Sequence, residues 1–210
     1  KALDAVAYIL PASLPADEDV AGWRCVWLAG EMTDIVGREA AERDATGSAF
    51  LPRLRDYLAA LVDKGQLTPV QRAAAGLALG RLGDPREDVD CDIPTTVRIE
   101  AGPFIMGSKK GEGQDEDPLA YEDEEPRHEV ALPAYKIGKY PVTVAQYRHF
   151  VDAEGYDPGI SGEYWKGGGL KWLKKSGQAA PVLWDNPQWT VDNHPVVGVT
   201  WYEAVAYCAW

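Results

Sequence analysis

The sequence predicts an α+β protein in which a helical segment precedes a region of short strands, capped helices and long loops. Two observations support this fold class. In the first 86 residues, apolar side chains recur every three or four positions, the spacing of helices that bury one face. From residue 95 onward, short alternating runs and most of the Trp and Tyr residues replace that spacing. The expected division is a helical repeat-like segment over residues 1–86, a linker over 87–94 and a second domain over 95–210.

Four helices are predicted in the first part. Apolar spacing indicates helices over residues 2–10, 20–36 and 48–63. The fourth begins at Thr68-Pro-Val-Gln71, where an N-cap Thr, a Pro at the first helical position and a Gln at the third form a capping box. It ends at Gly83, ahead of Asp84-Pro85. The phrase from 72 to 86 resembles helical repeats of HEAT type, which implies a spacer or scaffold without chemistry of its own.

Several short strands are predicted after the linker. Residues 95–100 alternate and carry β-branched side chains, and Phe104–Met106 follows a turn at Gly102-Pro103, so these two strands are expected to form a hairpin. The acidic, Gly-rich residues 111–125 indicate a loop. Further strands are expected at residues 128–132, 135–140 and 195–199.

Two more capping boxes predict helices in this region. Thr143 with Gln146, and Thr200 with Glu203, have the N-cap and third-position residues that satisfy free backbone N–H groups at a helix start. Between these helices, residues 156–192 are expected to form a long aromatic loop.

Composition excludes several function classes. The net charge is −12 and no Lys/Arg patch is visible, which argues against nucleic-acid binding. No apolar run approaches the roughly 18 residues of a membrane span. The three cysteines are far apart and odd in number, which favours reduced thiols in a cytoplasmic protein. No Cys/His cluster indicates a metal site.

Four motifs, in this order, resemble the first half of a formylglycine-generating-enzyme (sulfatase-modifying-factor, FGE-sulfatase) domain. They are Ile99-Glu-Ala-Gly-Pro-Phe-Ile-Met-Gly-Ser108, Glu125-Pro-Arg-His-Glu-Val130, Tyr140-Pro-Val-Thr-Val-Ala-Gln-Tyr-Arg-His-Phe150 and His194-Pro-Val-Val-Gly-Val-Thr-Trp-Tyr-Glu-Ala-Val-Ala-Tyr-Cys-Ala-Trp210. The resemblance covers residues 95–210. It implies a C-type-lectin-like fold with two helices, a small sheet and irregular chain held by aromatic rings.

The later segments of this family are absent from the sequence. They include an Arg-Gly-Gly-Ser-Trp segment, the copper-binding cysteines and the calcium ligands of true formylglycine-generating enzymes. The domain is therefore expected to be truncated, with a second polypeptide or the missing half completing it. Calcium or copper is expected only where that half is present, so the cofactor is unknown and whether this chain is an enzyme stays open.

Candidate site residues are few. Four tryptophans of the aromatic loop are candidates for ligand binding, weighed against a core-pinning role: Trp165, Trp172, Trp184 and Trp189. No catalytic residue and no metal ligand is assigned. The acidic run is expected to be a solvated loop rather than a calcium site. Gly167-Gly-Gly169 is expected to be a flexible loop, because no Lys-Ser/Thr follows it. His128 is expected to be structural.

Two functions are consistent with this sequence. The favoured one is a non-catalytic module of a larger bacterial protein that recognises a protein or a small molecule. Relatives of this kind include conflict-system effectors and the variable proteins of diversity-generating retroelements. The alternative, implied by the same resemblance, is a formylglycine-generating oxidase or a related iron-dependent sulfoxide synthase that acts on cysteine or thiol substrates.

Overall fold

The computed structural model describes residues 2–159 and 161–210, which form two compact units, Lys1–Ile93 with Pro141–Trp210 and Pro94–Tyr140. The helices are α1 (Ala2–Ile9), α2 (Val20–Val36), α3 (Arg38–Arg43), α4 (Ala45–Asp63), α5 (Pro69–Leu82), α6 (Val144–Asp152), α7 (Gly168–Ser176) and α8 (Trp201–Ala209), with 3-10 turns at Glu122–Glu124 and Ser161–Glu163. The strands are β1 (Thr96–Ile99), β2 (Gly102–Met106), β3 (His128–Leu132) and β4 (Tyr135–Gly138). The predicted α+β class, with helices preceding the mixed region, is confirmed.

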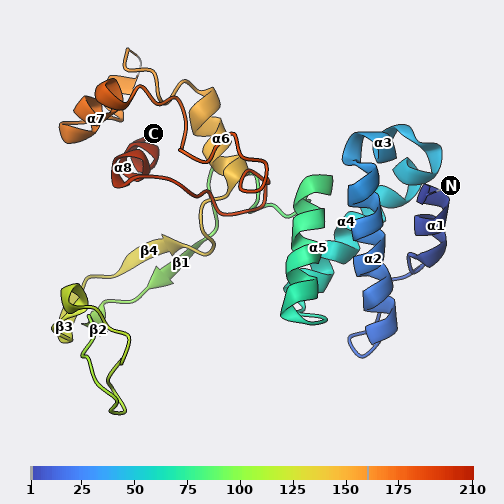
Figure 1. The fold of residues 1–210 in the computed structure, drawn as a ribbon, viewed down its shortest axis with the longest axis horizontal. Coiled ribbons are helices and arrows are strands. Elements are labelled where there is room, and N and C mark those ends of the chain that lie inside the picture. Colours follow the sequence, from blue (N-terminus) through green and yellow to red (C-terminus); the bar gives the residue numbers. More distant parts are fainter. Residues whose placement is uncertain (1, 160) are drawn as a thin grey trace. The chain divides into compact units, whose positions relative to one another are not determined.

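Helices α1–α5 pack around one apolar core (Figure 1). Its largest fully buried side chains are Trp23, Leu51, Leu54, Leu58, Leu61, Leu79 and Leu82. The four predicted helices and the capping box at Thr68 are confirmed. The short α3 was not predicted, and α4 begins at Ala45 rather than Ser48. Asp44 causes the earlier start, because its carboxylate accepts hydrogen bonds from the backbone N–H groups of Thr46 and Gly47.

Helix α5 and the residues after it are hydrogen-bonded to α6 and to the loop before α8. The hydroxyl of Thr143 donates to the carbonyl of Val89 at 2.6 Å, and Gln146 Nε2 donates to the carbonyl of Asp88 at 2.9 Å. Asn193 Nδ2 donates to the carbonyl of Gly76, within α5, at 2.9 Å. Segments far apart in the sequence therefore share one compact unit.

The four strands form a two-stranded antiparallel ribbon. β1 pairs with β4 and β2 pairs with β3, so the predicted hairpin between residues 95–100 and 104–106 is wrong. β1 and β2 follow one another along one side of the ribbon, with Ile99 opposite Tyr135 and Gly102 opposite Leu132. The residues between β1 and β2 only bend the chain. The acidic loop 107–127 makes the reversal instead.

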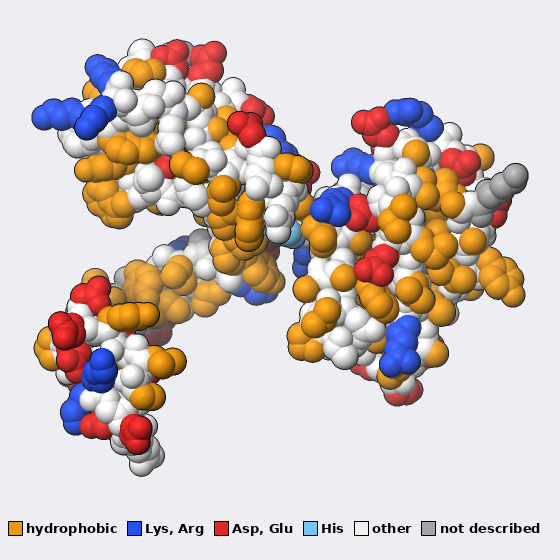
Figure 2. All heavy atoms as spheres, in the orientation of Figure 1, with side chains coloured by type: hydrophobic (Ala, Val, Ile, Leu, Met, Phe, Trp, Pro, Cys, Tyr) orange, Lys and Arg blue, Asp and Glu red, His pale blue; other side chains and the backbone are white. Residues whose placement is uncertain are grey.

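Both faces of this ribbon carry exposed apolar side chains. Figure 2 shows hydrophobic surface along the face in view. These side chains are Val97, Ile99, Phe104, Ile105, Met106, Leu132, Tyr135 and Ile137. A two-stranded ribbon has no second layer against which to bury them. These side chains are exposed because the ribbon has only two strands, although the side chains themselves are apolar.

Helices α6, α7 and α8 surround a second core of aromatic rings. The predicted capping boxes of α6 and α8 are confirmed. Two other predictions are wrong. Residues 168–176 form α7 rather than loop, and residues 195–199 contribute only one isolated bridge, Thr143 with Pro195, rather than a strand. None of the described helices is both long enough and apolar enough to cross a membrane.

Candidate functional site

A chain of buried hydrogen bonds runs through the aromatic core. The hydroxyls of Tyr147 on α6 and Tyr156 lie 3.0 Å apart, and the Tyr156 hydroxyl donates to Glu203 Oε1 on α8 at 2.7 Å. Glu203 is fully buried, and Tyr147 and Tyr156 are nearly so. These three side chains are the main buried polar group of the second core, and they join α6, α8 and the loop between α6 and α7.

The capping box of α8 explains how a carboxylate occupies this core. Glu203 Oε2 accepts a hydrogen bond from the backbone N–H of Thr200 at 2.6 Å, and the Thr200 hydroxyl accepts one from the backbone N–H of Glu203 at 3.3 Å. Oε1 is left for Tyr156. Both carboxylate oxygens therefore have donors, which offsets much of the cost of burying the group.

Burial fixes the protonation of the two tyrosines. It raises the pKa of Tyr156 and of Tyr147 far above the usual value near 10. Both hydroxyls therefore keep their protons at neutral pH. In this state the group holds helices together through its hydrogen bonds.

The four predicted tryptophans do not form one exposed surface. Trp165 is buried, and its Nε1 donates to the carbonyl of Gly155 at 2.6 Å. Its ring stacks on Trp172 at a centroid distance of 5.7 Å. Trp184 packs against Tyr147 at 6.1 Å, below the Arg148 guanidinium. Trp189 is 42% exposed. The structure thus joins Trp165 and Trp172 directly, while Trp189 presents the most accessible ring.

The three cysteines, His128 and the glycines at 167–169 also have defined surroundings. Cys25, Cys91 and Cys208 are free, and Cys91 Sγ accepts a hydrogen bond from Gln146 at 3.3 Å. His128 Nδ1 lies 2.7 Å from the carbonyl of Pro126 on an exposed strand. Gly167 and Gly168 form the start of α7, so the expectation of a flexible loop there is wrong.

The acidic loop is more ordered than its composition indicates. Glu116 accepts from Lys109 Nζ at 2.5 Å and from the Gly113 backbone at 3.0 Å, while Glu125 accepts from the Lys110 backbone at 2.8 Å. These carboxylates bind protein donors. Within residues 2–159 and 161–210, no group of three or more His, Cys, Asp or Glu side chains is placed to hold a metal ion.

Sequence reasoning identified Glu203 as a capping residue but missed its second role, and it missed Tyr156 altogether. The signal for Glu203 was the capping box itself. No local pattern marks Tyr156, because its partner lies 47 positions away in the sequence.

Comparison with known proteins identifies relatives of the second region. The model of the sulfatase-modifying factor enzyme 1-like domain family (FGE-sulfatase) matches residues 82–210. Hercynine oxygenase from Mycolicibacterium smegmatis is 32% identical over 148 residues, covering 62% of this chain and 33% of that protein. Formylglycine-generating enzyme from Bos taurus is 30% identical over 139 residues, covering 54% of this chain and 34% of that protein.

A relative of a different kind is serine/threonine-protein kinase pkn1 from Chlamydia caviae, 33% identical over 116 residues, which cover 54% of this chain and 16% of that protein. The chain thus spans about a third, or less, of the length of these relatives. The family match covers more than half of the chain and includes α6, α8 and the ribbon. On this evidence the chain belongs to the sulfatase-modifying factor enzyme 1-like (FGE-sulfatase) domain family, with helices α1–α5 preceding the domain.

Proposed function

We propose that this chain belongs to an oxygen-dependent oxidoreductase that acts on a cysteine or thiol substrate, as a formylglycine-generating oxidase or an iron-dependent sulfoxide synthase does. The observation that carries the proposal is the 32% identity over 148 residues with a protein named hercynine oxygenase. The similarity to formylglycine-generating enzyme adds a second oxidising relative. The sequence alone favoured a recognition module, with the oxidase as the alternative; with these relatives, the oxidase becomes the favoured function.

The described residues do not fit the metal that such chemistry implies. Iron or copper needs a converging set of imidazole, thiolate or carboxylate donors, and no group of three such side chains lies among the described residues. The cysteines also make no such set: Cys91 accepts from Gln146, and Cys208 is exposed. The proposal therefore gives these residues no role in metal binding.

What these residues supply is a rigid framework. Hydrogen bonds among Tyr147, Tyr156 and Glu203 hold α6 against α8. The bond from Trp165 to the carbonyl of Gly155 joins the two ends of the loop between α6 and α7. Active sites depend on such support, because small displacements of positioning groups reduce rates strongly. The framework role accounts for buried polar bonds that serve no direct chemistry.

The test uses the purified protein that carries these 210 residues, supplied separately with Fe(II) and with Cu(I). Oxygen consumption is measured with hercynine plus cysteine and with a Cys-x-Pro-x-Arg peptide. The proposal expects substrate-dependent oxygen uptake with one of the two substrate sets. Serine in place of cysteine is the matched control and should give none. A folded, metal-supplied protein that consumes no oxygen with either set would reject the proposal.

A second candidate is a recognition module for a protein or a small molecule. The specific observation in its favour is the kinase relative, in which the matching region occupies only 16% of the protein. Trp189 is the candidate contact, because its ring is the most exposed of the four loop tryptophans. In this case Trp189→Ala would weaken capture of the ligand while Trp172→Phe, a change within the ring stack, would not. Equal capture by both variants would reject a role for Trp189.

A further inference from the structure

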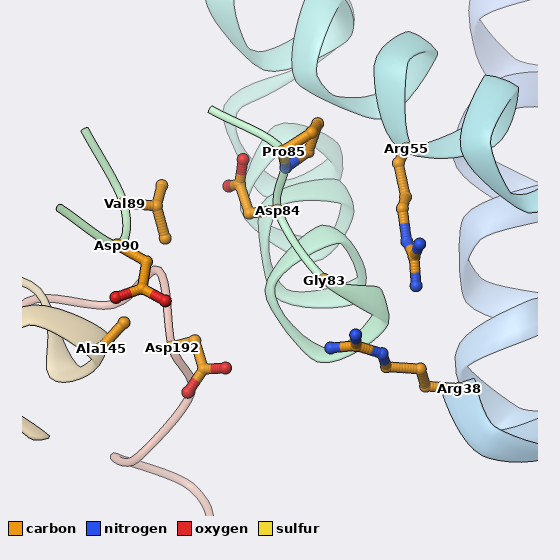
Figure 3. A pocket seen from close by; sticks show the side chains of 9 residues that line it. All are labelled: Arg38, Arg55, Gly83, Asp84, Pro85, Val89, Asp90, Ala145 and Asp192. Carbon is orange, nitrogen blue, oxygen red and sulfur yellow. The ribbon is translucent and has the colours of Figure 1, made fainter. Parts of the chain in front are cut away.

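A pocket of about 330 Å³ lies between α5 and α6, at the place where the helical segment continues into the FGE-sulfatase domain. Figure 3 shows its two walls. Arg38 and Arg55 reach it from α3 and α4, Asp90, Ala145 and Asp192 lie on the opposite side, and Gly83, Asp84 and Pro85 lie between them. Cationic and anionic side chains therefore face one another across one cavity.

The cationic wall has hydrogen-bond donors that lack a partner among the described residues. A Cβ atom added to Gly83 would lie 3.0 Å from Arg38 Nη1 and 3.4 Å from Arg55 Nη2, so both guanidinium groups lie against this residue. Both share the carboxylate of Glu42 as their ion-pair partner. Arg38 uses only its Nε for that bond, and no other described side chain accepts a hydrogen bond from its terminal nitrogens. Two positive charges thus face a single negative one.

The anionic wall has carboxylate oxygens that lack a partner among the described residues. Asp192 uses Oδ1 to accept from Arg148 at 2.6 Å. Asp90 uses Oδ1 toward His149 Nε2 at 2.6 Å, and that imidazole is charged only when protonated. The second oxygen of each carboxylate makes no hydrogen bond among the described residues. Asp84, by contrast, has both oxygens occupied by Arg86 and Asn193, so it belongs to the frame of the pocket.

The frame is hydrogen-bonded on both sides. Arg55 Nε donates to the carbonyl of Leu82 at 2.6 Å, which holds α4 to the end of α5. Asn193 Nδ2 donates to the carbonyl of Gly76 and to Asp84 Oδ2, each at 2.9 Å, which holds the opposite loop to α5. The pocket is therefore built from fixed elements rather than from loose side chains.

We propose that this pocket binds a small zwitterion, an α-amino acid in its ordinary ionic form. The carboxylate of the ligand pairs with Arg38 and Arg55, and its ammonium group pairs with Asp90 and Asp192. Opposed charges that each lack a full set of partners favour a ligand with both signs over a simple anion or cation. The volume lies near the lower end of the roughly 300–1,000 Å³ of ligand pockets, which limits the ligand to a small molecule.

The site is independent of the oxidising function proposed above. Its cationic wall comes entirely from helices that precede the family domain, and its anionic wall comes from the matched residues 82–210. Ligand binding there would link the two parts of the chain. A binding result, positive or negative, leaves the oxygen-consumption test unaffected.

The test is isothermal titration of the full chain with the standard amino acids, each alone. For every amino acid that binds, its carboxamide and its Nα-acetyl derivative are titrated as well, since each removes one of the two charges. The proposal expects at least one amino acid to bind, and both derivatives to bind on the order of tenfold or more weakly. Equal binding of either derivative would overturn the two-charge assignment, and no binding at millimolar concentration would overturn the site.

Two pairs of variants locate the binding. Arg38→Gln and Asp192→Asn should each weaken it on the order of tenfold. The controls Arg53→Gln and Asp56→Asn make the same changes at exposed positions of α4 outside the pocket, and they should leave affinity unchanged. Circular dichroism confirms that each variant is folded. Asp90→Asn serves in place of Asp192→Asn if loss of the Arg148 ion pair unfolds that variant. Unchanged affinity in the folded pocket variants would overturn the proposal.

Discussion

The Tyr156 hydroxyl donates a 2.7 Å hydrogen bond to Oε1 of Glu203 inside the aromatic core. The bond joins the loop after α6 to the first turn of α8, and it gives a fully buried carboxylate its second donor. The packing of the second core thus depends on a polar contact as well as on its rings.

Removing the Tyr156 hydroxyl should destabilise the protein. Tyr156→Phe leaves a carboxylate oxygen buried without a partner, and we expect the free energy of unfolding to fall by about 1–3 kcal/mol. Tyr164→Phe is the matched control, because that ring also packs on Phe150 while its hydroxyl makes no hydrogen bond among the described residues. Urea denaturation measures both. Equal losses in the two variants would show that the Tyr156–Glu203 bond contributes nothing.

The three capping threonines should differ in importance. Thr68, Thr143 and Thr200 all cap helices, but only Thr143 also donates to a backbone carbonyl outside its helix, that of Val89. Thr68→Ala and Thr200→Ala should each cost about 1 kcal/mol. Thr143→Ala should cost about 1 kcal/mol more, because the Val89 bond is lost as well. Thr143→Ser keeps the hydroxyl and should restore most of the difference in urea denaturation.

Two glycines of α5 should respond oppositely to the same substitution. A Cβ at Gly80 would collide with the Asn193 side chain and lie 2.6 Å from Val191 Cγ1, whereas a Cβ at Gly76 would meet only Val62 Cγ2, at 3.9 Å. Gly76→Ala should therefore stabilise the protein by about 0.5–1 kcal/mol through helix propensity. Gly80→Ala should destabilise it by about 1–3 kcal/mol. Thermal unfolding distinguishes them, and a stabilising Gly80→Ala would mean that residues 191–193 do not pack on α5.

Asp84 should contribute to acid sensitivity. Burial alone would raise its pKa, but hydrogen bonds from Arg86 and Asn193 outweigh burial and lower it. A carboxyl whose pKa is lower in the folded state stabilises the protein above its unfolded pKa of about 3.9 and loses this effect as the pH falls. Asp84→Asn should thus be less stable near neutral pH and lose less stability between about pH 7 and about pH 3.

Asp56→Asn removes an exposed carboxylate of α4 and is the control for this comparison. Its loss of stability over the same pH range should match that of the unmodified protein. Denaturation curves at several pH values measure all three proteins. An Asp84→Asn variant as acid-sensitive as the unmodified protein would contradict the assigned role.

Local signals in the sequence predicted the helices well. The capping boxes at Thr68, Thr143 and Thr200 act within four residues, and each begins a helix in the structure. Helix α7 was missed because Gly167 is its N-cap, Gly168 and Gly169 are its first two residues, and no side chain caps it. Its apolar residues Leu170, Trp172 and Leu173 also span only one turn.

Non-local pairing could not be predicted in the same way. β1 and β2 look like a hairpin because Gly102-Pro103 lies between their apolar runs, yet each pairs with a strand from residues 128–138. The pocket is even harder to predict from the sequence. Arg38, Asp90 and Asp192 belong to three separate segments, and no spacing in the sequence indicates that they meet.

The central claim is that the protein carrying this chain oxidises a sulfur compound. It is tested most directly by mass spectrometry of hercynine with cysteine, and of a Cys-x-Pro-x-Arg peptide, after incubation with the metal-supplied protein under oxygen or under nitrogen. The account predicts an oxidised product, either a sulfoxide that joins hercynine to cysteine or a formylglycine peptide, only under oxygen. Unchanged substrates under oxygen, with a folded and metal-supplied protein, would contradict it.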